Sequence, residues 1–208
     1  MVQVLKRSLL FLVALFLLSV ITHAQSAFNA NTSVLQIGIG GGRSSGYLNN
    51  ALYSSRFRTP VIVVNYETAL NKDLGPGLLS VGVQGFFRST SYRYTSNIFN
   101  ATYRERSRWS DYGIAARVLF HLTEVEMDEL DIYGGVVGGP VFSRHTYFES
   151  FDGDPSYTKE SSSFSLNGWS AGFLVGARYY LSSSLGVYGE LQYAWRLPYL
   201  SAGVAVKL

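Results

Sequence analysis

The chain has 208 residues, no cysteine, 15% charged residues and 15% aromatic residues. The length fits one domain, and the lack of cysteine excludes a disulfide scaffold, a thiolate zinc site and a cysteine nucleophile. The 47% hydrophobic content excludes a disordered chain, and 21 Gly, 15 Tyr and 13 Phe against 5 Pro favour strands and turns.

The first residues have the pattern of a secretory signal. Lys6 and Arg7 precede an apolar run over 9–21, and the small residues Thr22 and Ala24 then occupy the two positions that a signal peptidase reads. This order predicts a cleaved signal peptide over 1–24, followed by a short N-terminal segment over 25–33. A membrane anchor is the alternative, but the run is shorter than a span of about 20 residues. Two of the 17 Lys and Arg lie in the signal, so the rest is nearly neutral against 14 Asp and Glu, and no nucleic-acid partner is expected.

Beyond residue 33 the chain alternates apolar with small or polar residues. In the segment 185–195, Leu185, Val187 and Leu191 share one parity, while Gly186 and Glu190 share the other. Successive side chains of a strand point to opposite faces, so this pattern predicts a strand with one apolar face. Similar segments lie at 34–42, 60–70, 79–88, 111–122, 131–142, 168–181 and 199–208, which brings the prediction to eight strands.

The connections between these segments alternate in length. Long loops are expected at 44–59, 89–110 and 144–163, and short connections at 71–77, 123–130 and 182–184; the last connection, at 196–198, breaks the alternation by being short. Short turns at one end, long loops at the other and an even strand count are typical of an outer-membrane barrel. The predicted fold class is therefore all-β, an eight-stranded antiparallel up-and-down transmembrane β-barrel over 34–208.

Alternation alone leaves open whether the apolar face points inward, as in a soluble lipocalin-like barrel, or outward into lipid. The polar parity is rich in glycine and alanine, which suits the narrow interior of an eight-stranded barrel and favours the outward orientation. Aromatic residues lie near strand ends on the apolar parity: Phe87, Trp169, Tyr179, Tyr193 and Trp195. We expect them to form girdles at the two membrane interfaces, with ordinary core packing as the alternative.

On these strands the chain resembles the small outer-membrane β-barrel proteins, a porin-like group that includes the eight-stranded OmpA and OmpX types. The resemblance covers residues 34–208 and rests on the strand pattern. The last strand is similar to the signal that barrel-assembly machinery recognises in this family, although it ends in Leu208 where the family usually has an aromatic residue. The resemblance implies an outer membrane of a Gram-negative bacterium, with membrane lipid, lipopolysaccharide and the assembly machinery as partners.

Seven charged residues fall on the inward parity: Glu67, Arg88, Asp111, Arg117, Arg178, Glu190 and Lys207. An unpaired buried charge costs several kcal/mol, so these residues are expected to form a salt-bridge network that fills the lumen. The barrel is then not an open pore. A narrow polar channel is the rival interpretation, since wide channels need about twice as many strands.

The second long loop is basic and aromatic. It holds Arg93, Arg104, Arg106, Arg108 and Trp109, which are candidates for contact with lipopolysaccharide or with a protein partner. The third long loop holds Glu149, Asp152, Asp154 and Glu160 but lacks the spacing of a calcium loop, so no metal site is expected. The acidic turn with Glu124, Glu126, Asp128, Glu129 and Asp131 is expected to be a solubilising cap or a contact for a basic periplasmic partner.

Two further motifs carry little weight. The glycines after Val34 lack the third glycine of a dinucleotide loop, whose place Arg43 takes, so no cofactor is expected. Barrels that deacylate lipid A use a histidine and a serine, and outside the signal only His121 and His145 remain. His145 has no serine two residues further on, and His121 lies by a short turn.

The sequence thus predicts a non-enzymatic outer-membrane barrel that acts through its outer loops in surface binding or envelope integrity. Three alternatives stay open: a PorT-like secretion-support barrel, a narrow channel, and a lipid A-modifying barrel enzyme. Nothing in the sequence names a ligand.

Overall fold

The computed structural model describes residues 27–42, 55–73, 75–98, 101–123, 129–152 and 154–208. The predicted signal peptide and most of the acidic turn, including Glu124, Glu126 and Asp128, lie outside these residues. The strands are β1 (Ser33–Gly41), β2 (Ser55–Arg58), β3 (Val61–Asp73), β4 (Gly77–Ile98), β5 (Ala101–Leu122), β6 (Leu130–Phe151), β7 (Asp154–Tyr180), β8 (Leu185–Ala194) and β9 (Leu200–Lys207). None of the described residues forms a helix long and apolar enough to cross a membrane.

Eight of these strands close into a ring. The sheet runs β4-β3-β1-β9-β8-β7-β6-β5, and a further pairing of β4 with β5 joins its two ends. Every pairing is antiparallel, from β1 with β3 to β8 with β9. The predicted all-β antiparallel ring of eight strands is confirmed. The short strand β2 lies outside the ring and pairs only with β4.

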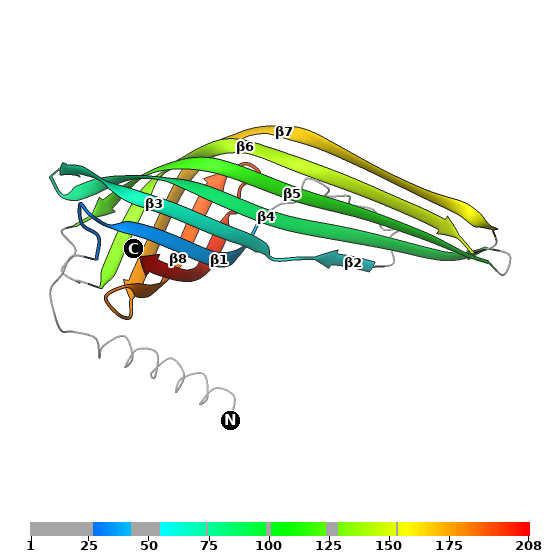
Figure 1. The fold of residues 1–208 in the computed structure, drawn as a ribbon, viewed down its shortest axis with the longest axis horizontal. Coiled ribbons are helices and arrows are strands. Elements are labelled where there is room, and N and C mark those ends of the chain that lie inside the picture. The colour runs from blue at the N-terminus through cyan, green and yellow to red at the C-terminus, as the bar shows by residue number, and fades with distance from the viewer. Residues whose placement is uncertain (1–26, 43–54, 74, 99–100, 124–128, 153) are drawn as a thin grey trace, which may run out of the picture.

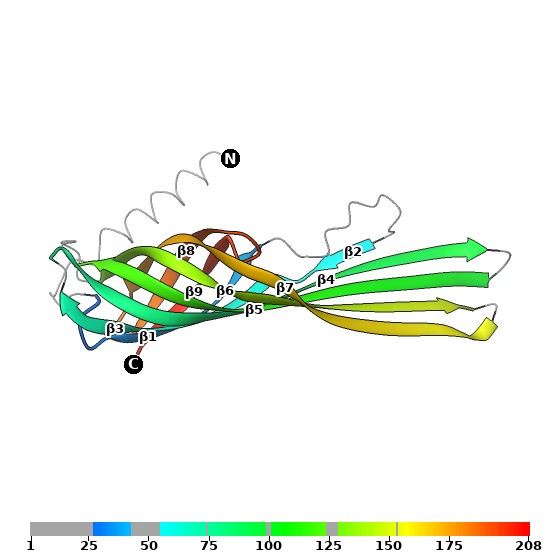
Figure 2. The ribbon, with the colours of Figure 1, turned by 90° about the horizontal axis from the view of Figure 1, so that it is seen from above.

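Four strands continue far beyond the barrel as a curved sheet (Figures 1 and 2). The β4–β5 hairpin pairs without interruption as far as Ile98 and Ala101, and β6 and β7 remain paired as far as Phe151 and Asp154. The segments 89–110 and 144–163, which we expected to be long loops, are instead mostly paired strands, because both hairpins extend the barrel ladder. We name this part, residues 89–98, 101–110, 144–151 and 154–167, the extension.

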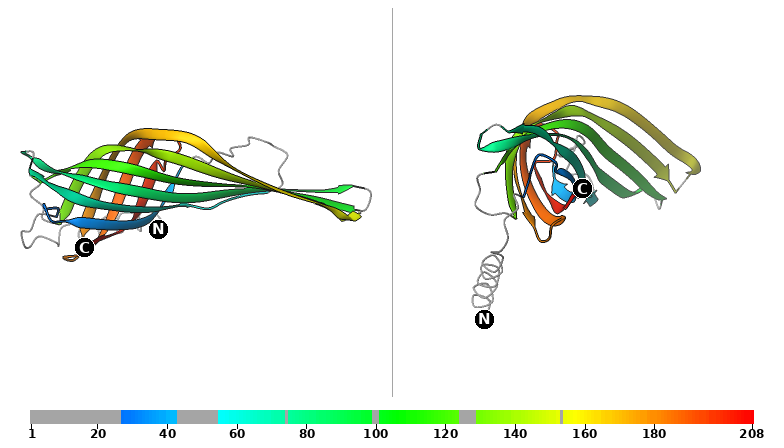
Figure 3. Two further views of the ribbon diagram at one scale, coloured as in Figure 1. Left: turned by 45° about the horizontal axis from the view of Figure 1, so that its top comes forward. Right: turned by 60° about the vertical axis from the view of Figure 1, so that its left-hand side comes forward.

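The end of the barrel opposite the extension holds the start of β1 and the end of β9 (Figure 3). We name this end the base. Residues 27–32 precede β1 and form a compact turn here, in which the backbone N–H of Thr32 donates to Asn29 O at 3.0 Å and that of Asn29 donates to Thr32 Oγ1 at 3.0 Å. Ala27 and Phe28 are buried, so this turn covers the lumen at the base.

Apolar side chains cover the outside of the barrel and polar ones lie within it. Ile114 is 64% exposed and Phe173 68%, whereas Gln36, Gln84 and Asp111 are fully buried. The burial pattern of β8 alternates strictly between exposed and buried over Leu185–Tyr193. The two parities read from the sequence therefore occupy opposite sides of the wall, with the apolar one outside.

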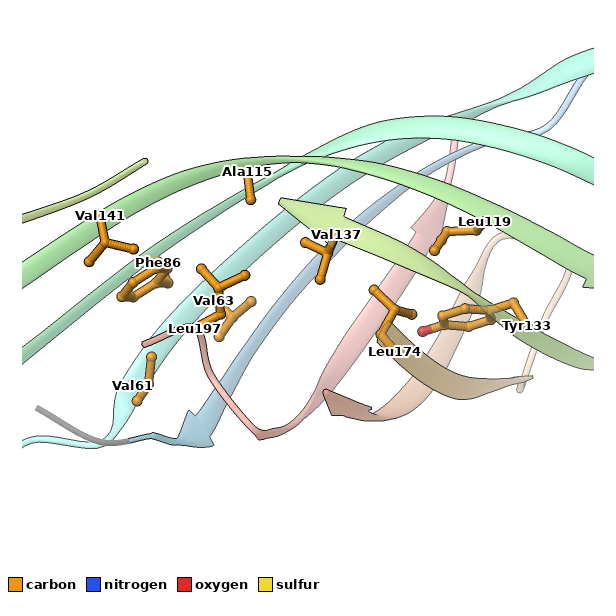
Figure 4. Close-up of a cluster of buried hydrophobic side chains, with 10 residues drawn as sticks. All are labelled: Val61, Val63, Phe86, Ala115, Leu119, Tyr133, Val137, Val141, Leu174 and Leu197. Carbon is orange, nitrogen blue, oxygen red and sulfur yellow. The ribbon is translucent and has the colours of Figure 1, made fainter. Parts of the chain in front are cut away.

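One layer of the lumen is apolar, which the polar inward parity did not predict. Val63, Phe86, Ala115, Val137 and Leu174 are buried together in the cluster that Figure 4 shows. Val61, Leu119, Tyr133, Val141 and Leu197 complete it. Arg88 and Asp111 lie beyond Val63 and Phe86 toward the extension, and Glu67 lies beyond them toward the base, so the charged residues of the lumen are divided into two groups.

Candidate functional site

The larger polar group lies toward the base and is centred on Arg178. Its guanidinium group donates through Nη2 to Glu67 Oε1 at 2.5 Å and through Nη1 to Asp131 Oδ2 at 2.9 Å. Nearby, Arg117 Nη2 contacts Glu190 Oε2 at 2.5 Å, and the Tyr133 hydroxyl donates to the same oxygen at 3.1 Å. All of these side chains are nearly inaccessible to solvent. The negative charges of these carboxylates are thus balanced by arginines inside the barrel.

His121 also belongs to this group, and its contacts with Ser80 and Asp131 are ordered like those of a nucleophile, a base and an acid. Its Nε2 lies 2.9 Å from Ser80 Oγ, and its Nδ1 lies 2.8 Å from Asp131 Oδ1. These contacts have the order of a Ser-His-Asp triad. However, Ser80 is fully buried, and the ring of Phe28 stacks on that of His121 with centroids 3.7 Å apart. The geometry therefore leaves Ser80 without access to a substrate.

The smaller polar group lies toward the extension. Arg88 Nε donates to Asp111 Oδ2 at 2.9 Å, and Ser143 donates to Asp111 Oδ1. Arg88 Nη2 also donates to the carbonyl oxygen of Arg196 at 3.0 Å. Arg196 lies in the β8–β9 turn with a φ of 72°, a left-handed conformation that non-glycine residues rarely adopt. This contact ties the turn to the barrel wall.

The seven charged residues predicted for the lumen all have inward-facing positions. Six of them are at most 2% exposed: Glu67, Arg88, Asp111, Arg117, Arg178 and Glu190. Lys207 is half-buried at the base, where its Nζ lies 3.9 Å from the centroid of the Tyr180 ring. The ion pairs form two separate groups rather than the single network that we expected.

Sequence reasoning missed three members of the larger group. Asp131 was assigned to the acidic turn, but it is the second residue of β6 and lies in the lumen. His121 and Ser80 lie on the same inward parity as Arg117 and Gly82, so that parity was the signal that pointed to them. Their mutual contact depends on strand register, which the sequence pattern does not give.

The aromatic residues predicted for the girdles lie on the outside of the barrel or at its rim. Tyr193 is 88% exposed and Trp169 77%, and Trp195 is also exposed. Phe87 packs on Tyr112, with ring centroids 5.2 Å apart. Tyr179 lies at the base, paired with Leu130 and Val187, whereas the other four lie near the opposite rim.

The extension places the arginines and Trp109 on opposite faces. Strand alternation places Arg104, Arg106 and Arg108 on the face that continues the outer wall, and Arg93 pairs with Arg106 across β4 and β5. Arg144 of β6 shares this face, since it pairs with Ser110. We name these five arginines the basic face. Trp109 points to the opposite side, so the predicted cluster of arginines with Trp109 is divided between two faces.

The opposite face of the extension carries tyrosines around a carboxylate. Glu149 Oε1 accepts hydrogen bonds from the hydroxyls of Tyr103 at 2.7 Å and Tyr157 at 3.0 Å. The hydrogen bond from Tyr103 is the main reason that the pKa of Glu149 lies below its usual value, and Tyr157 adds to the effect. Burial and the bond to Glu149 both raise the pKa of Tyr103. This carboxylate is thus held in its ionised form.

His145 lies on the same face beside Trp109. The two rings stack with centroids 4.0 Å apart, and His145 Nε2 lies 2.8 Å from Ser107 Oγ. Burial lowers the pKa of His145, which favours its neutral form. The serine close to this histidine belongs to the neighbouring strand β5, and sequence spacing therefore could not reveal it.

The acidic residues of the third predicted loop do not converge. Glu149 faces the tyrosines, whereas Glu160 pairs with Phe148 and lies on the basic face. Asp152 contacts Arg104 at 3.0 Å between exposed side chains. Within the described residues, no three His, Asp or Glu side chains are grouped so that they could hold a metal ion.

The geometry defines the class of the protein as an eight-stranded up-and-down β-barrel with a filled lumen and a long external sheet. Among solved structures the chain is similar to Ail, the attachment invasion locus protein of Yersinia pestis. It is 12% identical to Ail in complex with the heparin analogue sucrose octasulfate, with a TM-score of 0.41, over 85% of this chain and 94% of that chain. A second structure of Ail gives 12% identity, a TM-score of 0.38, and coverage of 85% and 93%. No family model and no curated protein matches the chain.

Proposed function

We propose that the protein is a non-enzymatic outer-membrane β-barrel with a closed lumen that acts in surface binding through its extension. The observation that carries the proposal is the reversed polarity of the barrel, with apolar side chains outside and ion pairs within. A soluble protein rarely exposes a continuous apolar surface, because its contact with water is unfavourable. A closed ring has no unpaired strand edge, as a hydrocarbon environment requires. The apolar outer surface and the closed ring of the barrel therefore fit the hydrocarbon core of a lipid bilayer.

The cellular location follows from the same proposal. A cleaved signal peptide delivers the chain to the periplasm, and barrel-assembly machinery inserts it into the outer membrane of a Gram-negative bacterium. The base, where β1 begins and β9 ends, then faces the periplasm, and the extension projects outside the cell. The short β7–β8 connection at 182–184 lies at the base, the usual periplasmic side of such barrels, whereas the short β8–β9 turn at 196–198 lies at the opposite rim.

The location is tested by gel mobility of outer-membrane protein with and without boiling in SDS. Folded membrane barrels resist the detergent until heated, because their strand pairing is closed. We expect a heat-dependent shift in the outer-membrane fraction. A soluble periplasmic protein without a shift would contradict the proposal.

The binding role rests on the basic face. Among the described residues, five arginines share this face with Glu160 and with Asp152, which pairs with Arg104. Arginine forms bidentate hydrogen bonds with phosphate, sulfate and carboxylate groups, so an anionic partner fits this surface. The extension holds the arginines on a paired sheet, which reduces the loss of conformational freedom on binding.

Binding is tested with dextran sulfate as a polyanionic probe and neutral dextran as its control. The double variant Arg104→Ala, Arg106→Ala should bind the sulfated polymer at least about tenfold more weakly, since each arginine contributes charge-assisted hydrogen bonds. The matched variant Ser150→Ala, Thr158→Ala alters neutral residues of the same face and should bind normally. Equal binding by the native chain and both double variants would contradict a role of the arginines in binding.

A hydrolase is the second candidate, because Ser80, His121 and Asp131 have the contacts of a catalytic triad. A serine nucleophile needs access as well as a base, and Phe28 and the barrel wall cover Ser80. We expect a fluorophosphonate probe to leave the folded protein unlabelled. Labelling of Ser80 that the variant His121→Gln abolishes would favour the enzyme instead.

A further inference from the structure

A pocket of about 530 Å³ lies on the basic face where the extension leaves the barrel. Its wall toward the barrel is aromatic and includes Phe87 and Tyr112, whose ring centroids are 5.2 Å apart. Phe57 of β2, which is 69% exposed, closes the side next to β4. The remaining wall carries Arg108 and Arg144. One cavity thus combines an apolar wall with two cations.

The strand register brings the two arginines within reach of one ligand. Arg108 pairs with Thr146 and Arg144 pairs with Ser110, so the arginines are diagonal neighbours on β5 and β6. Diagonal neighbours in a sheet lie roughly 7–8 Å apart, a distance that two guanidinium groups can span around one tetrahedral oxyanion. Among the residues that the structure describes, neither arginine forms an ion pair with a carboxylate.

Hydroxyl groups add neutral donors to the pocket. Ser89 Oγ and Ser110 Oγ lie 3.2 Å apart, and both residues line the pocket. Ser91 also lines it, and its Oγ is shielded from solvent without a hydrogen-bond partner among the described residues. Ser91 thus adds a third serine to the lining of the pocket.

The distance of the pocket from the rim of the barrel matches the thickness of the headgroup layer of a bilayer. Phe87, Tyr112 and Phe142 form an aromatic row across three paired strands at the rim of the barrel. At about 3.4 Å per residue, Arg144 lies roughly 7 Å and Arg108 roughly 14 Å beyond this row. Headgroups occupy about 5–8 Å beyond the hydrocarbon on each side, and long arginine side chains extend that reach. The pocket also faces away from the lumen, toward the surrounding lipid.

We propose that this pocket binds the phosphate headgroup of a phosphorylated lipid in the outer leaflet. Arg108 and Arg144 hold the phosphate oxygens, the serine hydroxyls donate to the same group, and the aromatic wall contacts the less polar part of the lipid. This inference rests on the proposed outer-membrane location and adds a defined ligand to the basic face. The aromatic wall distinguishes a lipid headgroup from free phosphate, which would contact only the polar wall.

The test uses the full chain in maltoside detergent and native mass spectrometry of bound lipid. The probes are phosphorylated lipid A and the same lipid A with its phosphates removed. The variants are Arg108→Gln and Arg144→Gln, singly and together, with Lys159→Gln as a control that removes a cation elsewhere on the extension. We expect the phosphorylated probe to be retained, and its retention to fall at least about tenfold in the double variant and little in the control.

Two arms use only the native sequence, so they hold even where a variant fails to fold. Equal retention of both forms of lipid A would overturn the inference. Displacement of lipid A by inorganic phosphate at equal concentration would also overturn it, because the site would then select free phosphate. A heat-dependent gel shift is recorded in parallel: its absence contradicts the outer-membrane location, whereas its presence without lipid selectivity contradicts only the pocket.

Discussion

Arg178 is the arginine that contacts two buried carboxylates in the larger polar group. It compensates Glu67 and Asp131 at once, and its planar guanidinium group suits two carboxylates on different strands. Removal of one partner of a buried ion pair is strongly destabilising, because the remaining charge is left in a poorly solvated site. Here two carboxylates would lose their arginine together, with His121 left beside both of them.

The variant Arg178→Leu should therefore lower the free energy of unfolding by about 3–5 kcal/mol. Arg106→Leu is the control, since Arg106 is exposed and should change stability by less than about 0.5 kcal/mol. Urea unfolding in lipid vesicles measures both. Equal midpoints for the two variants would show that the lumen pairs do not hold the barrel together.

Glu149 allows a pH test at the same scale. Its pKa lies below the usual value because Tyr103, and then Tyr157, donate hydrogen bonds to the ionised carboxylate. A lowered pKa in the folded state contributes stability above the unfolded pKa, and that stability is lost as the pH falls through the folded pKa. The extension should thus become less stable in acid.

We expect Tyr103→Phe to raise the pKa of Glu149 toward its ordinary value. Tyr94→Phe is the matched control, because the Tyr94 ring packs against the Tyr103 ring, with centroids 6.2 Å apart, rather than against the carboxylate. Carboxyl carbon shifts in an NMR titration report the pKa directly. An unchanged titration of Glu149 in Tyr103→Phe would mean that the hydrogen bond does not govern its ionisation.

At the scale of the strands, some glycines lie where the neighbouring strand leaves no room for a side chain. A Cβ added at Gly139 of β6 would lie 2.0 Å from the backbone oxygen of Ile114 on β5. A Cβ added at Gly189 of β8 would meet nothing within 4 Å. The first glycine permits close approach of two strands, whereas the second does not need to be glycine for space.

Gly139→Ala should therefore destabilise the barrel by about 1–3 kcal/mol, since β5 and β6 must move apart. Gly189→Ala should stay within about 0.5 kcal/mol of the original chain. The stabilities of the two variants are compared by the temperature at which each one shows its gel shift. A similar loss in both variants would contradict a specific role for strand contact at Gly139.

For the whole molecule, the lumen and its two ends decide whether ions can pass. The apolar layer around Phe86 and Leu174 lies between two polar groups, and the turn at Phe28 covers the base. Side chains thus fill the interior along the axis, as expected for a ring of eight strands.

The full chain in planar bilayers should give no steady single-channel current. Phe28→Ala tests the cover at the base, and it should still conduct no steady current because the apolar layer remains. A large, stable conductance of the native chain would favour the narrow-channel interpretation over the closed barrel.

The sequence alone determined the strands of the barrel and which residues of each strand share a face. Period-two alternation is a local property, and it is clear wherever one face is apolar and the other polar, as in 185–195. The extension was missed because both of its faces are polar or aromatic, so 89–110 shows no contrast between apolar and polar parities. Continued pairing of the two hairpins made it a sheet.

Only the tertiary structure decided which residues meet. Glu67 and Arg178 are 111 residues apart, and Ser80 and His121 are 41 apart, yet each pair is in contact in the lumen. Likewise, the pocket between Arg108 and Arg144 joins residues from two hairpins and from β2. Such contacts depend on ring closure and on register between distant strands, and a local pattern contains neither.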